Sequence, residues 1–457
     1  MKIRVDEKIR IQNPTPAIKK WCKENLILDN PDYYKKERMG LSVYGTPKTI
    51  SLYETAGDEI WLPFGCVKNI WRMCTRGLSW SIDFSPIRPF NYDSNIKLYP
   101  YQEDAVNKAI RAKNGILVMP CGSGKTQSGL ETIARIGGRA LWLTHTKELL
   151  NQSKSRAESV LGNVGAGIIT AGKVNVGNGI TFATIQTMCK IDLLQYRNFW
   201  DVIVVDECQH CAGSPTRVTQ FYKVMSNLCA RYKFGLTATP KRADGLEMSM
   251  FALLGDVIHE VDREDVETIC PIKIEKISTG WIPKDDVLSW DGTIDYNKVV
   301  DSLTHDEERF DVVLNYLGRC TGGCIVLANR VEYLNKMCKA YTDGQFGNAV
   351  CLSGTSNNKD DKAYRRKALE ALNTGELDCI FATYQLAKEG LDVPNLNYVI
   401  LATPEHDKTT VIQSVGRVGR KADGKEYGTV IDFVDEFGLY KKWSRERDGF
   451  YKKIGVF

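Results

Sequence analysis

The chain has 457 residues, 43% of them hydrophobic and 26% charged, with 61 Lys/Arg against 56 Asp/Glu. This length is too great for one hydrophobic core and predicts two to four domains of about 100 to 200 residues each. No apolar run approaches the ~18 residues that a membrane span requires, and the first residues lack the apolar region of a signal peptide. We therefore expect no membrane contact and a cytoplasmic location, which is the host cytoplasm if the source is a virus.

Residues 1–95 form the first predicted domain, a small α+β domain that contains no phosphate-binding loop. They hold 15 Lys/Arg against 11 Asp/Glu and four of the nine tryptophans. This combination suits nucleic acid, because cations neutralise phosphates and aromatic rings stack on bases or sugars. A small domain with a tryptophan-rich core and a solvated basic face remains an equal alternative. The expected strands are 49–53 and 59–62, and the expected helices are 17–28 and 67–76.

From residue 96 onwards, strand and helix patterns alternate, which predicts parallel sheets covered by helices. Residues 96–262 form a first α/β domain, residues 263–294 a mixed-charge crossing segment, and residues 295–457 a second α/β domain. The strands expected in the first domain are 116–119, 140–143, 167–170, 180–183, 202–205 and 234–236. Those expected in the second are 324–328, 349–352, 379–382, 398–402 and 428–433.

A glycine-rich loop, residues 119–126, joins the strand at 116–119 to a helix. Glycines 122 and 124 let the main chain curl with its N–H groups inward, and the following helix N-terminus adds a positive end, so the loop favours an anion. Lys125 can reach terminal phosphates and Thr126 can hold Mg²⁺. Met119 replaces the first glycine of the common pattern, which leaves the shorter G-x-G-K-T form of nucleic-acid motors. The expected ATP-binding residues of the loop are Gly122, Ser123, Gly124, Lys125 and Thr126.

Two adjacent carboxylates, Asp206 and Glu207, follow the apolar strand 202–205. At the C-terminal end of a parallel strand they would face the phosphate loop, because ligands bind along that edge of an open sheet. Asp206 can hold Mg²⁺, and Glu207 can orient or deprotonate the water that attacks the γ-phosphate. These two residues and Lys125 are therefore the predicted catalytic group of the first domain.

The fourteen cysteines are expected to be reduced and partly buried, since no export signal precedes them. Cys208 and Cys211 have a C-x-x-C spacing, but no second pair lies at zinc-site distance. Tetrahedral zinc needs four ligands, so a metal site there is not favoured.

With the loop and the sequence Asp-Glu-Cys-Gln-His at 206–210 in order, residues 98–435 resemble a superfamily 2 helicase of the DExH type. The resemblance implies two RecA-like domains with ATP between them. It also implies that Gln102 reads the adenine edge and that Tyr99 stacks on adenine. Segments 143–149 and 184–187 would hold the backbone of one nucleic-acid strand. Thr237-Ala238-Thr239-Pro240 would couple hydrolysis to strand movement through a hydroxyl contact to the DExH box.

The second half carries the remaining motifs of this resemblance. Residues 325–330 resemble the fourth motif, and residues 382–394 resemble the fifth, which places Gly390 and Asp392 among the nucleotide-binding residues. Residues 413–420 resemble the sixth. Two arginines three apart lie on one helix face, and guanidinium groups suit a γ-phosphate. We predict Arg420 as the arginine finger, a role worth about 10³ to 10⁵ in rate. Its expected catalytic companions are Arg417, on the phosphate side, and Gln413.

Segments 235–245 and 387–394 look most similar to the XPB-like repair helicases and the phage UvsW-like branch-migration helicases. This resemblance implies a monomeric, ATP-dependent DNA helicase or translocase. It would act without sequence preference on forked, junction or duplex DNA, alongside recombination or replication proteins. An RNA-directed helicase, a duplex translocase that does not separate strands, and a DNA-binding scaffold without hydrolysis remain open. The scaffold is disfavoured because the motif residues are present: Lys125, Thr126, Asp206, Glu207, Arg417 and Arg420.

Overall fold

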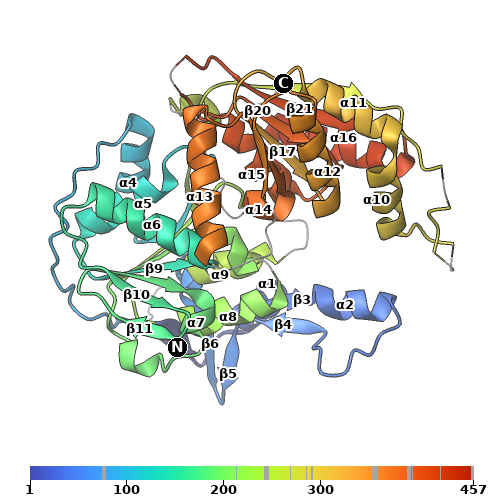
Figure 1. Ribbon diagram of the computed structural model, residues 1–457. Coiled ribbons are helices and arrows are strands. Elements are labelled where there is room, and N and C mark those ends of the chain that lie inside the picture. Colours follow the sequence, from blue (N-terminus) through green and yellow to red (C-terminus); the bar gives the residue numbers. More distant parts are fainter. Residues whose placement is uncertain are drawn as a thin grey trace. The chain divides into compact units, whose positions relative to one another are not determined.

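The computed structural model describes residues 1–74, 79–212, 214–240, 246–267, 269–284, 286–289, 292–352, 359–388, 393, 395–422 and 424–453. The chain divides into two compact units, which are described separately below (Figure 1). Unit 1 comprises Met1–Pro120 and Gly124–Asp262, and unit 2 comprises Cys121–Ser123 and Arg263–Phe457. Among the described residues, no helix combines the length and the apolar character that crossing a membrane would require.

The N-terminal part of unit 1 is built on a five-stranded sheet in the order β5-β6-β2-β1-β7. In its central hairpin, apolar and basic residues alternate, so that Ile3, Val5, Ile9 and Ile11 are buried while the intervening cations face away. α1 (Pro16–Asn25) begins at Thr15, whose hydroxyl accepts the N–H of Ile18. The strands are β1 (Lys2–Val5), β2 (Lys8–Gln12), β5 (Glu54–Ala56), β6 (Glu59–Pro63) and β7 (Ser79–Ile82).

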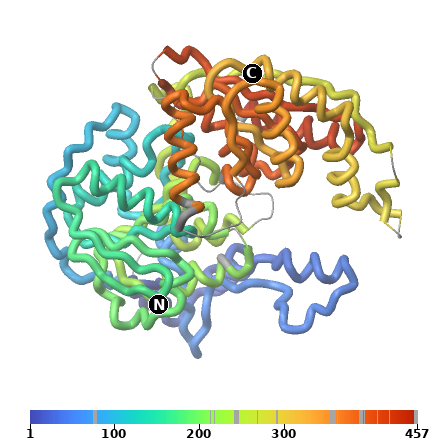
Figure 2. The backbone as a smooth tube through the Cα atoms, viewed as in Figure 1, coloured from blue at the N-terminus to red at the C-terminus, as the bar shows by residue number. Residues whose placement is uncertain are grey.

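A second, smaller element of this part is an arm, drawn in blue, that extends from the N-terminal sheet (Figure 2). It consists of β3 (Ile27–Asp29), α2 (Pro31–Arg38) and β4 (Thr49–Ser51), with β3 and β4 paired antiparallel. α2 buries none of its residues. The short turn η1 (Phe64–Cys66) and α3 (Val67–Met73) return the chain to the sheet.

The N-terminal sheet shares its hydrophobic core with the α/β part of unit 1. Ala212, Val218, Leu246 and Ala252 belong to the same buried cluster as the β1–β2 hairpin. At Gly65 the two backbones approach so closely that an ideal Cβ would lie 2.4 Å from the nitrogen of Gly255. The N-terminal residues are therefore packed into unit 1 as part of one continuous core.

The α/β part of unit 1 contains an eight-stranded sheet in the order β11-β10-β12-β9-β13-β14-β8-β15. All its pairings are parallel except the β10–β11 hairpin. Its central strands are uninterrupted apolar runs because both faces are covered. The strands are β8 (Asn114–Val118), β9 (Ala140–Thr144), β10 (Gly167–Thr170), β11 (Lys173–Asn175), β12 (Ile180–Thr184), β13 (Val202–Val205), β14 (Tyr232–Thr237) and β15 (Val257–Glu260).

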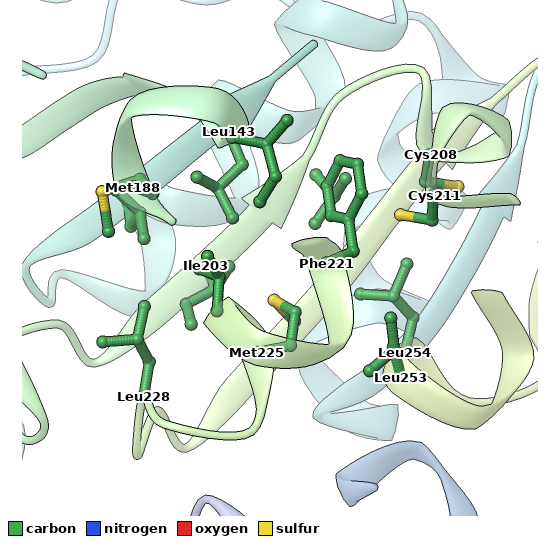
Figure 3. Close-up of a cluster of buried hydrophobic side chains, with 14 of the residues drawn as sticks. Leu143, Met188, Ile203, Cys208, Cys211, Phe221, Met225, Leu228, Leu253 and Leu254 are labelled. Carbon is green, nitrogen blue, oxygen red and sulfur yellow. The ribbon is translucent and has the colours of Figure 1, made fainter. Parts of the chain in front are cut away.

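One face of this sheet packs against three helices that lie between its strands in the chain. Leu143 and Ile203 from the sheet meet Met188, Phe221 and Leu254 from the helices (Figure 3). The helices of this part are α4 (Pro100–Ala112), α5 (Lys125–Ile136), α6 (Lys147–Val160), α7 (Ile185–Met188), α8 (Pro215–Met225) and α9 (Glu247–Leu254).

Unit 2 contains a six-stranded sheet in the order β16-β21-β20-β17-β19-β18, in which the described strands all pair in parallel. The strands are β16 (Ile272–Ser278), β17 (Cys324–Ala328), β18 (Ala349–Leu352), β19 (Cys379–Thr383), β20 (Tyr398–Leu401) and β21 (Gly428–Val434). The helices are α10 (Tyr296–His305), α11 (Glu307–Leu317), α12 (Val331–Asp343), α13 (Lys359–Thr374), α14 (Tyr384–Lys388), α15 (Lys408–Val418) and α16 (Gly438–Lys453).

Two buried ion pairs connect α11 and α16 of unit 2 to β21 and to the residues that follow it. Arg309 on α11 lies 2.7 Å from Asp435, and Arg447 on α16 lies 2.6 Å from Asp432. The hydroxyl of Tyr451 donates a further hydrogen bond of 2.8 Å to Asp432. Each carboxylate is thus buried together with a guanidinium that neutralises it.

The structure confirms the α/β class, the parallel sheets and the β-rich N-terminal region. It also contains strands that the sequence did not predict, namely β1, β2, β3, β5, β7, β11, β15 and β16. β16 lies inside the segment 263–294 that was interpreted as a crossing segment, and it pairs in parallel with β21 at one edge of the second sheet. Its alternation of isoleucine with charged residues is typical of an edge strand with one exposed face.

Candidate active site

The phosphate loop runs from β8 to α5 in the conformation that a glycine-rich loop allows. Gly122 and Gly124 have φ values of +84° and +75°, a region that other residues rarely adopt. An ideal Cβ at position 124 would lie 2.4 Å from Nε2 of Gln102, so glycine is also required there by space. Met119, which replaces the first glycine of the common pattern, is fully buried, and its N–H donates to the carbonyl of Thr237 at 2.9 Å.

Lys125 begins α5 and bends back over the start of the loop. Its Nζ donates to the carbonyl oxygens of Met119 and Pro120, each at 3.4 Å, and lies 4.0 Å from Oε1 of Glu207. These are long contacts for an ammonium group, which prefers distances below about 3.0 Å. The group is therefore placed beside the carboxylate that follows β13, at the start of the helix that ends the phosphate loop.

Asp206 and Glu207 lie together at the C-terminal end of β13. Oδ2 of Asp206 accepts a hydrogen bond of 3.2 Å from Ser153, and its Oδ1 accepts one of 3.0 Å from the N–H of Glu207. Burial, and next the charge of Glu207, raise the pKa of Asp206 to about 7. Glu207 has a φ of +48°, an unusual value for a residue with a side chain and one that occurs often at functional sites.

The oxygen donors at this position fit Mg²⁺. Mg²⁺ is held in such sites by one or two carboxylates together with substrate phosphates and water, which it binds through oxygen. Among the described residues no group of three or more His, Cys, Asp or Glu side chains is placed to hold a metal ion by itself. Asp206 and the hydroxyl of Thr126 would therefore hold Mg²⁺ jointly with the nucleotide, whose phosphate charge the ion neutralises.

The C-x-x-C pair is a structural pair of thiols. Cys208 and Cys211 are both buried, and the thiol of Cys208 lies 3.4 Å from the sulfur of Met250. Burial raises the pKa of both thiols, which disfavours the thiolate form that binds a metal.

A chain of hydrogen bonds connects the segment after β14 to the carboxylate of Glu207. Thr237 Oγ1 donates to Oε1 of Gln209 at 2.6 Å, and Nε2 of Gln209 donates to Oε2 of Glu207 at 2.8 Å. The N–H of Thr239 donates to Thr237 Oγ1 at 3.0 Å. The predicted hydroxyl contact between residues 237–240 and the DExH box is confirmed.

Gln102 lies next to the phosphate loop at the start of α4. Its Oε1 accepts the N–H of Tyr99 at 3.0 Å, which leaves its amide nitrogen as the group that faces Gly124. The ring of Tyr99 is nearly parallel to that of Tyr101, with a centroid distance of 5.8 Å and an interplanar angle of 10°. The adenine contacts of Gln102 and Tyr99 remain predictions.

The two segments expected to hold a nucleic-acid strand are joined to each other and to the DExH box. Nε2 of Gln186 donates to the carbonyl of His145 at 2.7 Å, and the rings of His145 and His210 stack at a centroid distance of 3.5 Å. Sequence reasoning did not predict this stack or the hydrogen bond from Ser153 to Asp206. His210 could have been noticed as the last residue of the DExH box, whereas Ser153 carried no signal in α6.

In unit 2, α15 carries Gln413 and Arg417 but ends before Arg420. The prediction that both arginines lie on one helix face is wrong, because α15 stops at Val418 with Gly419 as its C-cap. Beyond that glycine the chain forms a β-bridge between Arg420 and Ile269. Nη2 of Arg417 donates to the carbonyl of Ala387 at the end of α14.

Two predicted nucleotide-binding residues, Gly390 and Asp392, lie outside the described residues, as does part of the segment 235–245. The structure therefore leaves their roles as predictions.

Comparison with known proteins identifies the class of this chain. Residues 95–242 match the family model "Type III restriction enzyme, res subunit", and residues 308–422 match "Helicase conserved C-terminal domain". A phosphate loop followed by a DExH box and a C-terminal helicase domain defines an ATP-hydrolysing nucleic-acid motor.

Relatives with curated names support a more specific assignment. A chain from Acanthamoeba polyphaga mimivirus, named "Putative ATP-dependent RNA helicase L396", is 25% identical over 80% of this chain and 70% of its own length. The "DNA 3'-5' translocase XPB2" of Sulfurisphaera tokodaii is 26% identical over 77% of this chain and 84% of its own. The chain belongs to the superfamily 2 helicases and is related to their XPB group.

A solved structure shows the same fold. S. cerevisiae Dbp5 bound to RNA and ADP BeF3 is similar with a TM-score of 0.55 and 16% identity, over 79% of this chain and 88% of that chain. At this level of identity the similarity concerns the fold only.

Proposed function

We propose that this helicase is an ATP-dependent DNA helicase or translocase that remodels forked and junction DNA during recombination, repair or replication. In this proposal residues 1–95 bind DNA, residues 96–262 bind ATP, and residues 295–457 form the second motor domain after the segment 263–294. Contacts to the phosphate backbone would let the protein track along DNA without reading its sequence. Resemblance to the XPB and UvsW groups and the name of the XPB2 relative support DNA as the substrate.

The observation that carries the proposal is the rigid attachment of the N-terminal residues to the ATP-binding part of unit 1. Beyond the shared core, Arg197 forms ion pairs with Asp6 and Glu7 in the turn between β1 and β2. The hydroxyl of Tyr222 donates to Glu54 on β5 at 2.8 Å. DNA held by the N-terminal residues would therefore move together with the ATP site.

The roles of the site residues follow from their chemistry. Lys125 binds the terminal phosphates, Asp206 and Thr126 hold Mg²⁺, and Glu207 orients or deprotonates the attacking water. Arg420 supplies the finger that stabilises charge in the transition state, with Arg417 and Gln413 in support. Differential affinity of ATP for two arrangements of the motor would convert hydrolysis into stepping.

Two other functions remain candidates because relatives carry their names. The mimivirus relative is named as an RNA helicase, which favours an RNA-directed enzyme. The XPB2 relative is named as a translocase, which favours movement along duplex DNA without strand separation.

The test is ATP hydrolysis with no nucleic acid, single-stranded DNA, duplex DNA, a four-way junction and RNA. Wild type is compared with Glu207→Gln and with the control Glu260→Gln, an exposed carboxylate of the same sheet. Strong stimulation by junction or forked DNA, lost in Glu207→Gln and kept in Glu260→Gln, is the expected result. A strand-displacement assay then separates unwinding from translocation alone. Stimulation by RNA alone would contradict DNA as the substrate. Stimulation by none of these nucleic acids would contradict the proposed function.

A further inference from the structure

The tryptophans of the N-terminal residues differ in environment. Trp61 lies beside two cations of the β1–β2 hairpin, with Nζ of Lys8 at 5.3 Å and the guanidinium carbon of Arg10 at 5.7 Å from its ring centroid. Trp71 on α3 is 63% exposed. Burial of this aromatic ring against a ligand would be favourable, because it would remove apolar surface from water.

Trp71 rests on a second tryptophan. Its ring lies 4.9 Å from that of Trp80 on β7, with an interplanar angle of 53°. Trp80 is paired in register with the buried Ile3 of β1, so it is held at the edge of the N-terminal sheet. Ile82, two residues along the same strand face, is 70% exposed. We call Trp71, Trp80 and Ile82 the tryptophan patch.

Two cations lie close to Trp71 in the sequence of α3, and the carboxylate of Asp83, next to Ile82, is paired with Arg4. α3 carries Lys68 and Arg72, three residues before and one residue after Trp71. Within the part of the chain that the structure describes, neither of them forms an ion pair or a side-chain hydrogen bond. A supported aromatic ring next to two available cations has the chemistry of a site for single-stranded nucleic acid, in which a base stacks and the flanking phosphates are neutralised.

We propose that the tryptophan patch is a stacking site for an unpaired base of single-stranded DNA, with Lys68 and Arg72 neutralising the adjacent phosphates. The inference rests on the proposed function for its substrate, because a fork exposes unpaired bases beside a duplex. Since the patch belongs to unit 1, a base held there is held by the same compact unit as the phosphate loop's helix. The patch would then recognise the unpaired arm of a fork rather than its duplex.

The experiment compares protein variants on two DNA substrates that differ only in whether the unpaired arm carries bases. Binding affinity is measured for a fork with a natural unpaired arm and for the same fork with abasic sites throughout that arm. Trp71→Ala should weaken binding of the natural fork about tenfold, the size expected for loss of one stacked base, and leave binding of the abasic fork unchanged. Trp71→Phe, which keeps an aromatic ring, should retain most of the affinity for the natural fork. Arg72→Gln should weaken both forks equally and reduce the dependence of binding on salt.

The control variant is Tyr44→Ala, which removes an aromatic ring that is 96% exposed on the arm of the same domain. It should weaken natural and abasic forks to the same small extent. The proposal is overturned if Trp71→Ala weakens both forks equally, if it weakens neither, or if Tyr44→Ala shows the same preference for the natural fork. Retained fork-stimulated ATP hydrolysis in wild type with no effect of Trp71→Ala would favour a protein partner for the patch while leaving the proposed function intact. Failure of wild type to bind or respond to any fork would instead contradict the proposed function.

Discussion

Thr237 donates its hydroxyl hydrogen bond to Gln209 at 2.6 Å, and Gln209 in turn donates to Glu207 at 2.8 Å. The residue expected to sense strand movement is thus two hydrogen bonds from the carboxylate expected to act on water. Because each bond orients the next donor, a displacement of the chain after β14 would change the position of the Glu207 carboxylate.

Thr237→Val keeps the shape of the buried side chain and removes only the hydroxyl. We expect DNA-stimulated ATP hydrolysis to fall severalfold and the number of base pairs separated per ATP to fall further, because Gln209 loses the bond that fixes it. Both quantities are measured on one fork substrate. Thr132→Val is the matched control, since the hydroxyl of Thr132 donates only to the carbonyl of Ser128 in its own helix at 2.7 Å. Equal behaviour of the two variants would contradict the coupling role.

Arg420 and Arg417 should respond differently to removal. Arg420→Ala is expected to lower the rate of ATP hydrolysis about 10³-fold or more with no change in ATP affinity. Arg417→Ala should also lower the stability of unit 2 by about 1 kcal/mol, because Arg417 donates to the carbonyl of Ala387. Single-turnover hydrolysis, nucleotide binding and thermal unfolding are measured together. A larger catalytic loss in Arg417→Ala than in Arg420→Ala would reverse the two roles.

Lys233 predicts a pH dependence of stability in unit 1. It is fully buried, its Nζ donates to the carbonyl of Met225 at 3.0 Å, and burial lowers its pKa to about 8 from the ordinary 10.5. Between these values the unfolded chain binds more protons than the folded one, so stability rises with pH. From pH 7 to 9.5 the free energy of unfolding of wild type should rise by about 2 kcal/mol relative to that of Lys233→Met. Most of this rise falls above pH 8, where the slope is ~1.4 kcal/mol per pH unit.

The measurement is urea unfolding of wild type and Lys233→Met across this pH range. Comparison with the variant removes the contribution of the cysteines and tyrosines that titrate nearby in pH. Parallel stability curves for the two proteins would contradict a lowered pKa of Lys233 in the folded protein.

Asp432 is expected to be essential for the stability of unit 2. It is buried and accepts hydrogen bonds from Arg447 and Tyr451. Asp432→Asn leaves the guanidinium buried without its counter-charge, which costs about 3 to 5 kcal/mol. Asp448→Asn is the control, because the Asp448–Lys276 pair is partly exposed and is worth about 0 to 1 kcal/mol. Similar denaturation curves for the two variants would contradict this assignment.

The sequence predicted the strands of the two larger sheets that are continuous apolar runs and missed several short strands, some of which alternate with charge. Residues 202–205 are apolar throughout because helices cover both faces of β13, and such a run is visible without a structure. In β1 and β2 every second residue is charged or polar, and β16 mixes three isoleucines with charged residues, so a short strand with one covered face resembles a polar loop in the sequence. Such a strand is distinguished from a loop only by its pairing with a neighbouring strand.

The positions of site residues were predictable where those residues belong to a recognisable sequence motif. Lys125, Asp206 and Glu207 are brought together as their order and spacing indicated. The end of α15 before Arg420 depends on Gly419 and on the bridge to Ile269, a contact between residues about 150 apart in the chain. Burial of Lys233 likewise depends on a carbonyl of Glu7, and the local sequence of β14 carries no sign of it.

The shared core of unit 1 limits how the chain can be divided into fragments and how its parts can be exchanged. A fragment that begins at residue 96 would expose Ala252, Val218 and the ammonium of Lys233 to water, because their covering residues come from the N-terminal sheet. Exchange of this sheet with that of a relative would require the turn at Asp6 and Glu7 and its partner Arg197 to be carried over together. The two parts are therefore inherited as one piece, and a change of substrate would have to arise on their outer surface.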